Sequence, residues 1–312
     1  MIHDMKIAFV GKGGSGKTTT AALFARYMQQ RGHRTLALDA DINQHFAAAL
    51  DYEGKLANMG MEIDRIKQHL AGVNALFEID EMKKTTPPGR GSNLVTLDAG
   101  DWFMQEFTED ADGVRIAGAG EIPEGNVGVR CYHSLNGAVE LLLGHMADKD
   151  DDMVIVDMTA GADALSSTLF AKVDALVLVV EPTRKSLGVY VQLMPAIEKY
   201  GLPLYVVANK IVEQSDTNFI LETIPELVAV LPQSPYIRAR ERGQHVKMER
   251  DLINQLGILA AHVLATPRDW QGMQQRSYEL HLKNADDWAG EQIKNQIDPG
   301  FSLANAVTRL QK

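Results

Sequence analysis

The chain has 312 residues and an acidic balance, with 31 lysines and arginines against 41 aspartates and glutamates and a formal net charge of -10. This length allows one large α/β domain or two smaller ones, and the charge excludes broad, salt-driven nucleic-acid binding but leaves a small local basic patch open. One cysteine excludes an intramolecular disulfide, and no segment reaches the roughly 20 apolar residues that a membrane helix needs.

The first predicted unit is a strand, a glycine-rich loop and a helix. The apolar run 5–10 precedes G-K-G-G-S-G-K-T-T, and apolar residues on one helical face follow. This context fits G-x-x-x-x-G-K-[ST], in which backbone N–H groups cradle phosphates, the lysine reaches the β- and γ-phosphates and the hydroxyl binds Mg²⁺. We therefore predict an ATP site with Lys17 and Thr18 in the last two roles. The predicted phosphate-binding residues are Gly11, Gly13, Gly14, Ser15, Gly16, Lys17, Thr18 and Thr19.

The second predicted unit is an apolar strand at 35–39 that ends in the acids Asp39 and Asp41, followed by a helix at 44–50. Ligands of a doubly wound sheet lie outside the carboxyl ends of its strands, so we expect these acids to face the phosphates. The alternative is that they serve as helix N-caps, for which aspartate is well suited. The stretch 51–128 is less regular, with one strand predicted at 114–117.

From there to residue 264, apolar runs alternate with amphipathic helical patterns. Runs that are apolar throughout are typical of parallel strands buried on both faces. The alternation predicts an α/β fold with a doubly wound, mostly parallel sheet and helices on both faces, as in P-loop NTPases. The predicted strands are 153–157, 175–180, 204–208 and 227–231, and the predicted helices are 135–146, 187–200 and 248–264.

Polar residues at the ends of these strands are predicted to complete the ATP site. Asp157 follows four apolar residues, as expected of a carboxylate that holds Mg²⁺ through water. Asn209 and Lys210 follow the strand 204–208, where an amide can exchange two hydrogen bonds with the adenine edge. Pro232, after the last strand, is expected to form another wall of the base pocket. The alternative at Asn209 is a turn-forming asparagine.

The alternating pattern ends at Pro267. We predict a P-loop ATPase domain at 1–266 and a helical C-terminal extension at 267–312, packed on the main domain or on a partner subunit. The extension lacks the Lys/Arg-rich polar face of a helix that lies on a membrane. The single cysteine, and a first strand that begins near Met1 without a secretory leader pattern, predict a cytoplasmic protein.

The loop sequence K-G-G-S-G-K-T-T, with its early Lys12, resembles the deviant phosphate loop of a family of dimeric ATPases. The family includes the septum-site-determining and partition ATPases, the arsenite-pump ATPase, the nitrogenase iron protein and the nickel-insertion ATPase of carbon monoxide dehydrogenase. The resemblance implies a homodimer, formed on ATP binding, in which Lys12 reaches the partner's phosphates as a cation in trans. It also implies that Asp41 positions or activates the attacking water and that Asp39 supports the Mg²⁺ shell.

The stretches D-A-D-I-N-Q, D-M-T-A-G and V-D-A-L-V-L-V-V-E-P-T most resemble the nickel-insertion branch, but one motif departs from it. That branch has Cys-x-Cys before the helix that corresponds to 135–146, where this chain has V-R-C ending at Cys131. One cysteine per subunit cannot hold an iron–sulfur cluster of the nitrogenase type. Cys131 and His133 of two subunits could still hold Ni²⁺ or Zn²⁺, whereas a lone cysteine is usually a small buried hydrophobe.

Together these features predict a switch that binds Mg²⁺ and ATP, hydrolyses ATP as a dimer and acts on a client protein, such as a metalloenzyme awaiting maturation. Two alternatives stay open. A partition or positioning ATPase would act on DNA or membrane in its ATP-bound form, and would need a basic surface. A small-molecule kinase or ligase on the same fold would place its substrate in the region 51–128.

Overall fold

The computed structural model describes residues 5–76, 78–121, 132–240, 242–244 and 246–310, without the side chains of 132–134. In this part of the chain one sheet of eight strands has the order β3-β4-β2-β5-β1-β6-β7-β8. Every neighbouring pair is parallel except β3 with β4, which confirms the predicted doubly wound, mostly parallel sheet. The strands are β1 (Met5–Gly11), β2 (Arg34–Ala40), β3 (Glu109–Ala111), β4 (Val114–Gly118), β5 (Asp152–Met158), β6 (Ala175–Val180), β7 (Leu204–Ile211) and β8 (Ala229–Pro232).

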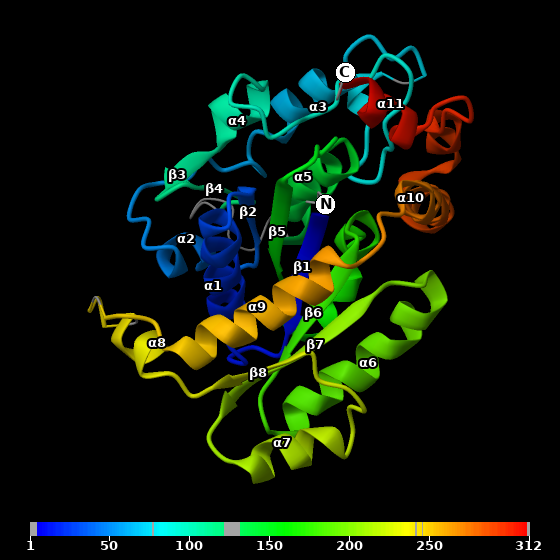
Figure 1. Ribbon diagram of the computed structural model, residues 1–312. Helices are drawn as coiled ribbons and strands as arrows, with labels where there is room; N and C mark the ends of the chain where they lie inside the picture. Colours follow the sequence, from blue (N-terminus) through cyan, green and yellow to red (C-terminus); the bar gives the residue numbers. More distant parts are fainter. Residues whose placement is uncertain (1–4, 77, 122–131, 241, 245, 311–312) are drawn as a thin grey trace.

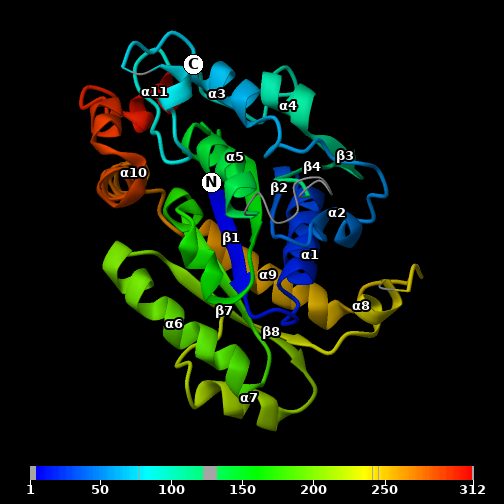
Figure 2. The same ribbon diagram turned by 180° about the vertical axis from the view of Figure 1, so that it is seen from behind.

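Helices cover both faces of the sheet, with α1 and α9 on one face and α5 and α6 on the other (Figures 1 and 2). Within the described residues, none of the helices combines the length and the apolar character needed to cross a membrane. The α-helices are α1 (Lys17–Gln30), α2 (Phe46–Ala49), α3 (Ile63–Ala71), α4 (Trp102–Phe107), α5 (Tyr132–Gly144), α6 (Arg184–Tyr200), α7 (Gln214–Leu221), α8 (Pro235–Arg240), α9 (Arg250–Leu264), α10 (Trp270–Asn284) and α11 (Leu303–Leu310). Shorter helical turns are η1 (Ile79–Glu81), η3 (Gly161–Ser166), η4 (Leu169–Lys172), η5 (Ala285–Ala289) and η6 (Glu291–Gln296).

The central strand β1 contributes to two separate cores. Ile7 and Phe9 pack with α1 and α9, whereas Ala8 and Val10 pack with α5 and α6. Successive side chains of a strand point to opposite faces, so a strand covered on both faces is apolar throughout. This packing holds the carboxyl end of β1 in place, and the glycine-rich loop begins there.

The stretch 51–128 contains more regular structure than its pattern predicts. β4 coincides with the strand predicted at 114–117, but the sequence pattern does not predict α3, α4 and β3, which have nine, six and three residues. Elements this short do not fill the window of about 11–18 residues over which a hydrophobic period becomes visible. Ile66 and Leu70 of α3 share a core with Leu135 and Val139 of α5, so tertiary packing stabilises this helix.

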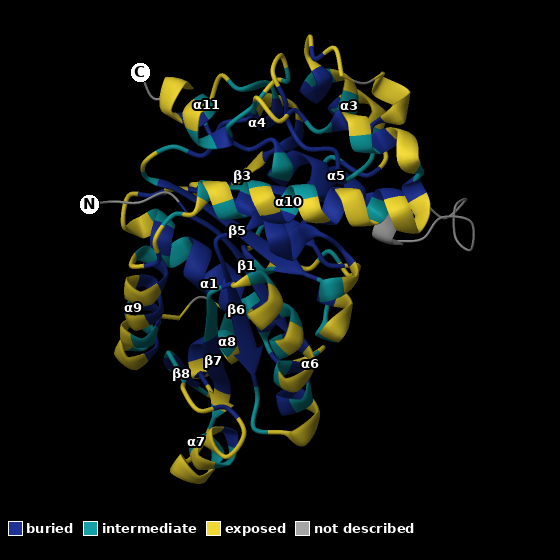
Figure 3. Ribbon diagram, turned by 90° about the vertical axis from the view of Figure 1, so that its right-hand side faces the viewer, coloured by how far each residue is buried: buried dark blue, intermediate teal, exposed yellow. Residues whose placement is uncertain are grey.

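The helices after Pro267 pack on their own chain, which agrees with the predicted helical extension. In Figure 3, α10 runs across the molecule, and it contacts η4. His281 of α10 is hydrogen-bonded to Thr85, with 2.9 Å between Nδ1 and Oγ1. Thr86 donates to Gln296 of η6 at 2.7 Å. The extension therefore covers the segment around residues 85 and 86, while the domain boundary at 266/267 stays a prediction.

A buried group of charges, which we call the charged anchor, fixes the start of this extension. The anchor consists of Lys6, Asp148, Asp174 and Arg268. The Arg268 guanidinium pairs with both aspartates, and Lys6 Nζ lies 2.9 Å from Asp148 Oδ1. Trp270 lies 4.0 Å from the Arg268 guanidinium, measured to the ring centroid. Since Lys6 is at the amino end of β1, the anchor lies at the opposite edge of the sheet from the glycine-rich loop.

Arg268→Ala is expected to lower the free energy of unfolding by about 3–5 kcal/mol, because it leaves two buried carboxylates without a shared cation. Asp148 and Asp174 are 0% and 2% exposed at their side chains. The matched control is Arg65→Ala, which breaks an ion pair whose side chains are 53% and 44% exposed and should cost below about 1 kcal/mol. Urea unfolding of both variants checks the prediction, and equal losses would contradict it.

Candidate functional site

The glycine-rich loop joins β1 to α1 with the backbone geometry of a phosphate-binding loop. Gly14 and Gly16 have φ angles of 83° and 90°, in the left-handed region that favours glycine. A Cβ atom at Gly16 would lie 2.2 Å from Asn209 Nδ2, so a larger residue there would have to displace the Asn209 amide. α1 begins at Lys17, and the loop therefore directs its N–H groups and the positive end of the helix dipole toward one place.

Lys17 lies between two carboxylates from neighbouring strands. Its Nζ is 2.9 Å from Asp41 Oδ2 and also pairs with Asp157 Oδ1. Thr18 donates a hydrogen bond of 2.6 Å to Asp157 Oδ2. Burial on its own would lower the pKa of Lys17, but Asp157 and Asp41 outweigh it, and the pKa is raised above its usual value. Lys17 is therefore a charged ammonium in a nearly closed environment, as needed to bind anionic phosphates.

Asp39 lies beside this group, but backbone donors engage its oxygens. It is fully buried and stands in register with Asp157 across the β2–β5 pair. Its oxygens accept from the N–H groups of Asp41, at 3.1 Å, and Phe46, at 2.8 Å. Burial, followed by the charge of Asp157, raises the pKa of Asp39 to about 8. Asp39 thus binds the N–H of the first residue of α2, but the N-cap of that helix is His45, which makes no side-chain cap bond. The support of Mg²⁺ by Asp39 stays a prediction.

The donors at the head of the loop fit Mg²⁺. The Thr18 hydroxyl and the Asp157 carboxylate are hard oxygen ligands, adjacent to one another and to Lys17. Mg²⁺ is commonly held by one or two carboxylates together with substrate phosphates and water. Among the residues that the structure describes, no group of three or more His, Cys, Asp or Glu side chains is arranged to hold a metal ion without such additional ligands.

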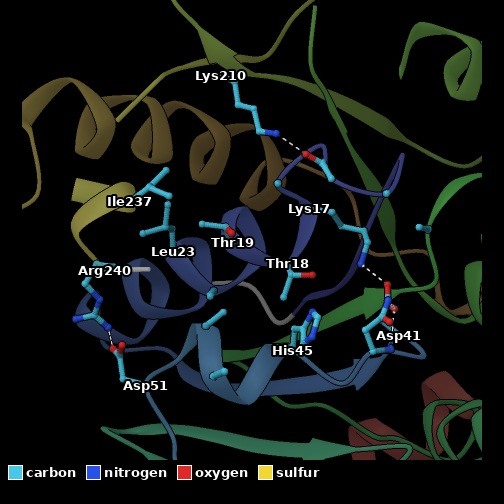
Figure 4. Close-up of a pocket in the computed structure, with 18 of the residues that line it drawn as sticks. Lys17, Thr18, Thr19, Leu23, Asp41, His45, Asp51, Lys210, Ile237 and Arg240 are labelled. Atoms are coloured by element: carbon cyan, nitrogen blue, oxygen red, sulfur yellow. Dashed lines mark hydrogen bonds and ion pairs between the residues drawn. The ribbon is translucent and has the colours of Figure 1, made fainter. Parts of the chain in front are cut away.

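A cavity of about 790 Å³ opens over the loop (Figure 4). In the figure Lys17 points toward Asp41 at one end, and Leu23 and Ile237 line the other. This volume is within the usual range of ligand sites and can hold a nucleoside triphosphate. Sequence reasoning misses its far wall, which comes from α1, α2 and α8. That wall is formed by Ala22, Leu23, Arg26, His45, Ala48, Ala49, Asp51, Tyr236, Ile237 and Arg240.

The predicted base-binding residues line a smaller adjoining cavity of about 140 Å³. Asn209, Lys210 and Pro232 all border it. Asn209 Nδ2 donates to the Ser15 carbonyl at 2.8 Å, and Lys210 Nζ donates to the Gly14 carbonyl. These contacts hold the carboxyl end of β7 against the phosphate loop. The adenine contact of Asn209 stays a prediction.

Lys12 lines the large cavity and pairs with a residue that sequence reasoning misses. Its Nζ lies 3.1 Å from Glu181 Oε1 and donates to the Gly13 carbonyl at 3.0 Å. Lys210 Nζ lies 3.1 Å from the other oxygen of Glu181. Glu181 directly follows the apolar strand β6, just as Asp157 closes an apolar run in β5. An acidic residue directly after an apolar strand is the sequence signal that would have pointed to Glu181.

Two candidate ligands of an interface metal are not placed by the structure. Cys131 lies outside the described residues, and His133 is in α5 but its side chain is not among those described. Their proposed binding of Ni²⁺ or Zn²⁺ stays a prediction. The site that the structure does bring together is the one at the head of the glycine-rich loop, formed by Lys17, Thr18 and Asp157 with Asp41.

Comparisons with known proteins agree with this geometry. The family model for the CobQ/CobB/MinD/ParA nucleotide binding domain matches residues 7–246. The carbon monoxide dehydrogenase accessory protein CooC of Rhodospirillum rubrum is 27% identical over 243 residues, covering 77% of this chain and 88% of that protein.

Two solved structures share the fold. One is the MinC:MinD cell division protein complex of Aquifex aeolicus, with a TM-score of 0.56 and 15% identity, covering 85% of this chain and 98% of that chain. The other is a putative plasmid partition protein of Borrelia burgdorferi bound to AMPPNP, with a TM-score of 0.52 and 12% identity, covering 83% of this chain and 98% of that chain. With a family model that spans most of its length, this chain belongs to the CobQ/CobB/MinD/ParA family of nucleotide-binding P-loop ATPase domains.

Proposed function

We propose that the protein is a Mg²⁺-dependent ATPase that pairs with a second copy on ATP binding and passes the resulting change to a partner protein. The observation that carries the proposal is the convergence of Lys17 with Asp41 and Asp157, next to the Thr18 hydroxyl. A cation that can bind phosphates, donors suited to Mg²⁺ and a carboxylate beside the γ-phosphate position are the parts that phosphoryl transfer to water requires.

In this proposal each residue has one role. Lys17 would leave its two carboxylates to bind the β- and γ-phosphates, and Thr18 and Asp157 would hold Mg²⁺, which would supply positive charge to neutralise the phosphates. Asp41 orients the attacking water and Lys12 supplies a cation to the partner's site. Because hydrolysis would need both copies, its rate would depend on the dimer.

The partner class is inferred from the relative named as a carbon monoxide dehydrogenase accessory protein. We propose a metalloenzyme, or a protein that assembles one, as the client, and a cytoplasmic location, which fits the single cysteine of the chain. The interface metal at Cys131 and His133 belongs to this proposal. Its test is metal analysis of the purified protein with and without ATP, in wild type and in Cys131→Ser.

The proposed function predicts that ATP hydrolysis per chain rises with protein concentration and saturates. With a non-hydrolysable ATP analogue and Mg²⁺, light scattering should give the mass of a dimer, whereas omission of Mg²⁺ should abolish hydrolysis. A constant rate per chain with a monomer mass throughout would overturn the dimeric mechanism. Turnover that appears only with an added small molecule would favour a kinase or ligase, and DNA retention that needs ATP would favour a partition ATPase.

A further inference from the structure

Glu181 occupies a fixed position between the phosphate loop and α6. It directly follows β6, which is hydrogen-bonded to β1, so its backbone adjoins the loop that follows β1. The Glu181 N–H donates to Ser186 Oγ at 3.1 Å, and Thr183 caps α6 through the Ser186 N–H. These two hydrogen bonds hold the backbone around Glu181 against the start of α6.

The Glu181 carboxylate forms ion pairs with two lysines. Lys12 binds one oxygen and Lys210 the other, each at 3.1 Å. Glu181 is the most buried of the three, with 14% of its side chain exposed against 32% for Lys12 and 47% for Lys210. Burial by itself raises the pKa of Glu181, but hydrogen bonds from Lys210 and Lys12 more than offset this, and the pKa falls below its usual value. The carboxylate is therefore ionised and available as a counter-ion.

Lys12 is bent back toward its own chain in this arrangement. Its Nζ donates to the carbonyl of the very next residue, Gly13, as well as to Glu181. A side chain folded back onto its own loop cannot also extend across a subunit interface. If Lys12 acts in trans, its contact with Glu181 has to break before the lysine can reach the partner's phosphates and add its contact to the dimer.

We propose that Glu181 is a positioning residue that holds Lys12 on its own chain and thereby sets the threshold for nucleotide-dependent pairing. This inference rests on the proposed dimeric ATPase. Because Lys12 is one-third exposed, the ion pair is weak. The several negative charges of a triphosphate on the partner can therefore draw the lysine away. The Lys12–Glu181 ion pair would therefore disfavour the dimer in the absence of nucleotide and would still allow it to form when nucleotide is bound.

The test is the dissociation constant of the dimer in a non-hydrolysable ATP analogue and Mg²⁺, measured by analytical ultracentrifugation. Glu181→Gln keeps the shape of the side chain and removes its charge. We expect it to lower the dissociation constant by about two- to fivefold, the range that a part-exposed ion pair allows. The charge-matched control is Glu198→Gln on the exposed side of α6, because any loss of one negative charge reduces the repulsion between two chains of net charge -10.

A double variant identifies the route of the effect. In a Lys12→Gln background, Glu181→Gln should give no further tightening, since the lysine that it releases is gone. The role of Glu181 would be overturned if Glu181→Gln tightened the dimer equally with and without Lys12, if it left the dimer unchanged or weaker, or if Glu198→Gln tightened the dimer as much. None of these results would overturn the proposed dimeric ATPase. A wild-type protein that stays monomeric with nucleotide would overturn the proposed function itself and this inference with it.

Discussion

Lys17→Ala is expected to reduce ATP hydrolysis by at least about 10²–10³-fold, because it removes the cation that would neutralise charge on the transferred phosphate. The same change should lower the free energy of unfolding of the nucleotide-free protein by about 3–5 kcal/mol, since it leaves the carboxylates that Lys17 bridges uncompensated. Asp157 is fully buried and Asp41 nearly so. Activity assays and urea unfolding test both parts. Lys55→Ala, at an exposed position, is the control and should change neither quantity.

The stability loss in Lys17→Ala should grow with pH. Burial and Asp157 raise the pKa of Asp39 from 3.8 to about 8, and Lys17 opposes that rise. A carboxyl whose pKa is raised by folding costs stability that is absent below the unfolded pKa, grows between the two pKa values and is complete above the folded one. Without Lys17 the pKa of Asp39 rises further, so the extra loss from this carboxyl begins above about pH 8, where Asp39 is ionised in the wild type, and the loss should be larger at about pH 9 than at about pH 5. Equal losses at both values would show that the carboxylates are not responsible.

Lys12→Ala is expected to lower ATP hydrolysis by about 10³-fold or more if the lysine acts as a cation in trans, by analogy with an arginine finger. Nucleotide binding should be retained, because Lys17 and the loop remain. The decisive measurement mixes Lys12→Ala with Asp41→Asn, each inactive alone. In a mixed dimer the site of the first chain has its own Asp41 and receives Lys12 from the second. With random pairing, about a quarter of the wild-type rate should return.

The control for this mixing experiment is Lys12→Ala combined with the double variant Lys12→Ala/Asp41→Asn. No dimer in that mixture contains Lys12, so activity should stay at the background level. If the first mixture also stays inactive although the chains exchange, Lys12 acts within its own chain. The trans mechanism would then be wrong.

The central part of the site is predictable from sequence because the order of the strands in the sheet, and not the individual side-chain contacts, brings its residues together. The carboxyl ends of β1, β2 and β5 meet at one edge of the sheet, so Lys17, Asp41 and Asp157 have to converge once the strands are recognised. The role of Asp39 is not predictable in the same way. Its neighbours are N–H groups whose direction depends on the turn into α2.

Interactions between distant residues are the part that the sequence does not reveal. The charged anchor pairs Lys6 with Asp148 and Arg268 with Asp174, and no local period marks charges so far apart. Glu181 is missed for the same reason, because its partners Lys12 and Lys210 come from other strand ends. The short elements of the stretch 51–128 depend on packing that a local pattern does not encode.

The position of the charged anchor determines how deletion experiments should be interpreted. A chain cut after Thr266 would lose Arg268 and Trp270 together, and would leave Asp148 and Asp174 beside Lys6 alone. If such a shortened protein failed to fold or lost activity, the buried aspartates left without Arg268 would be a sufficient cause. The result would not identify the missing helices as a signalling module. Substitutions on the outward side of α10, such as at the exposed Gln275 and Glu279, leave that interior intact and are the cleaner probe.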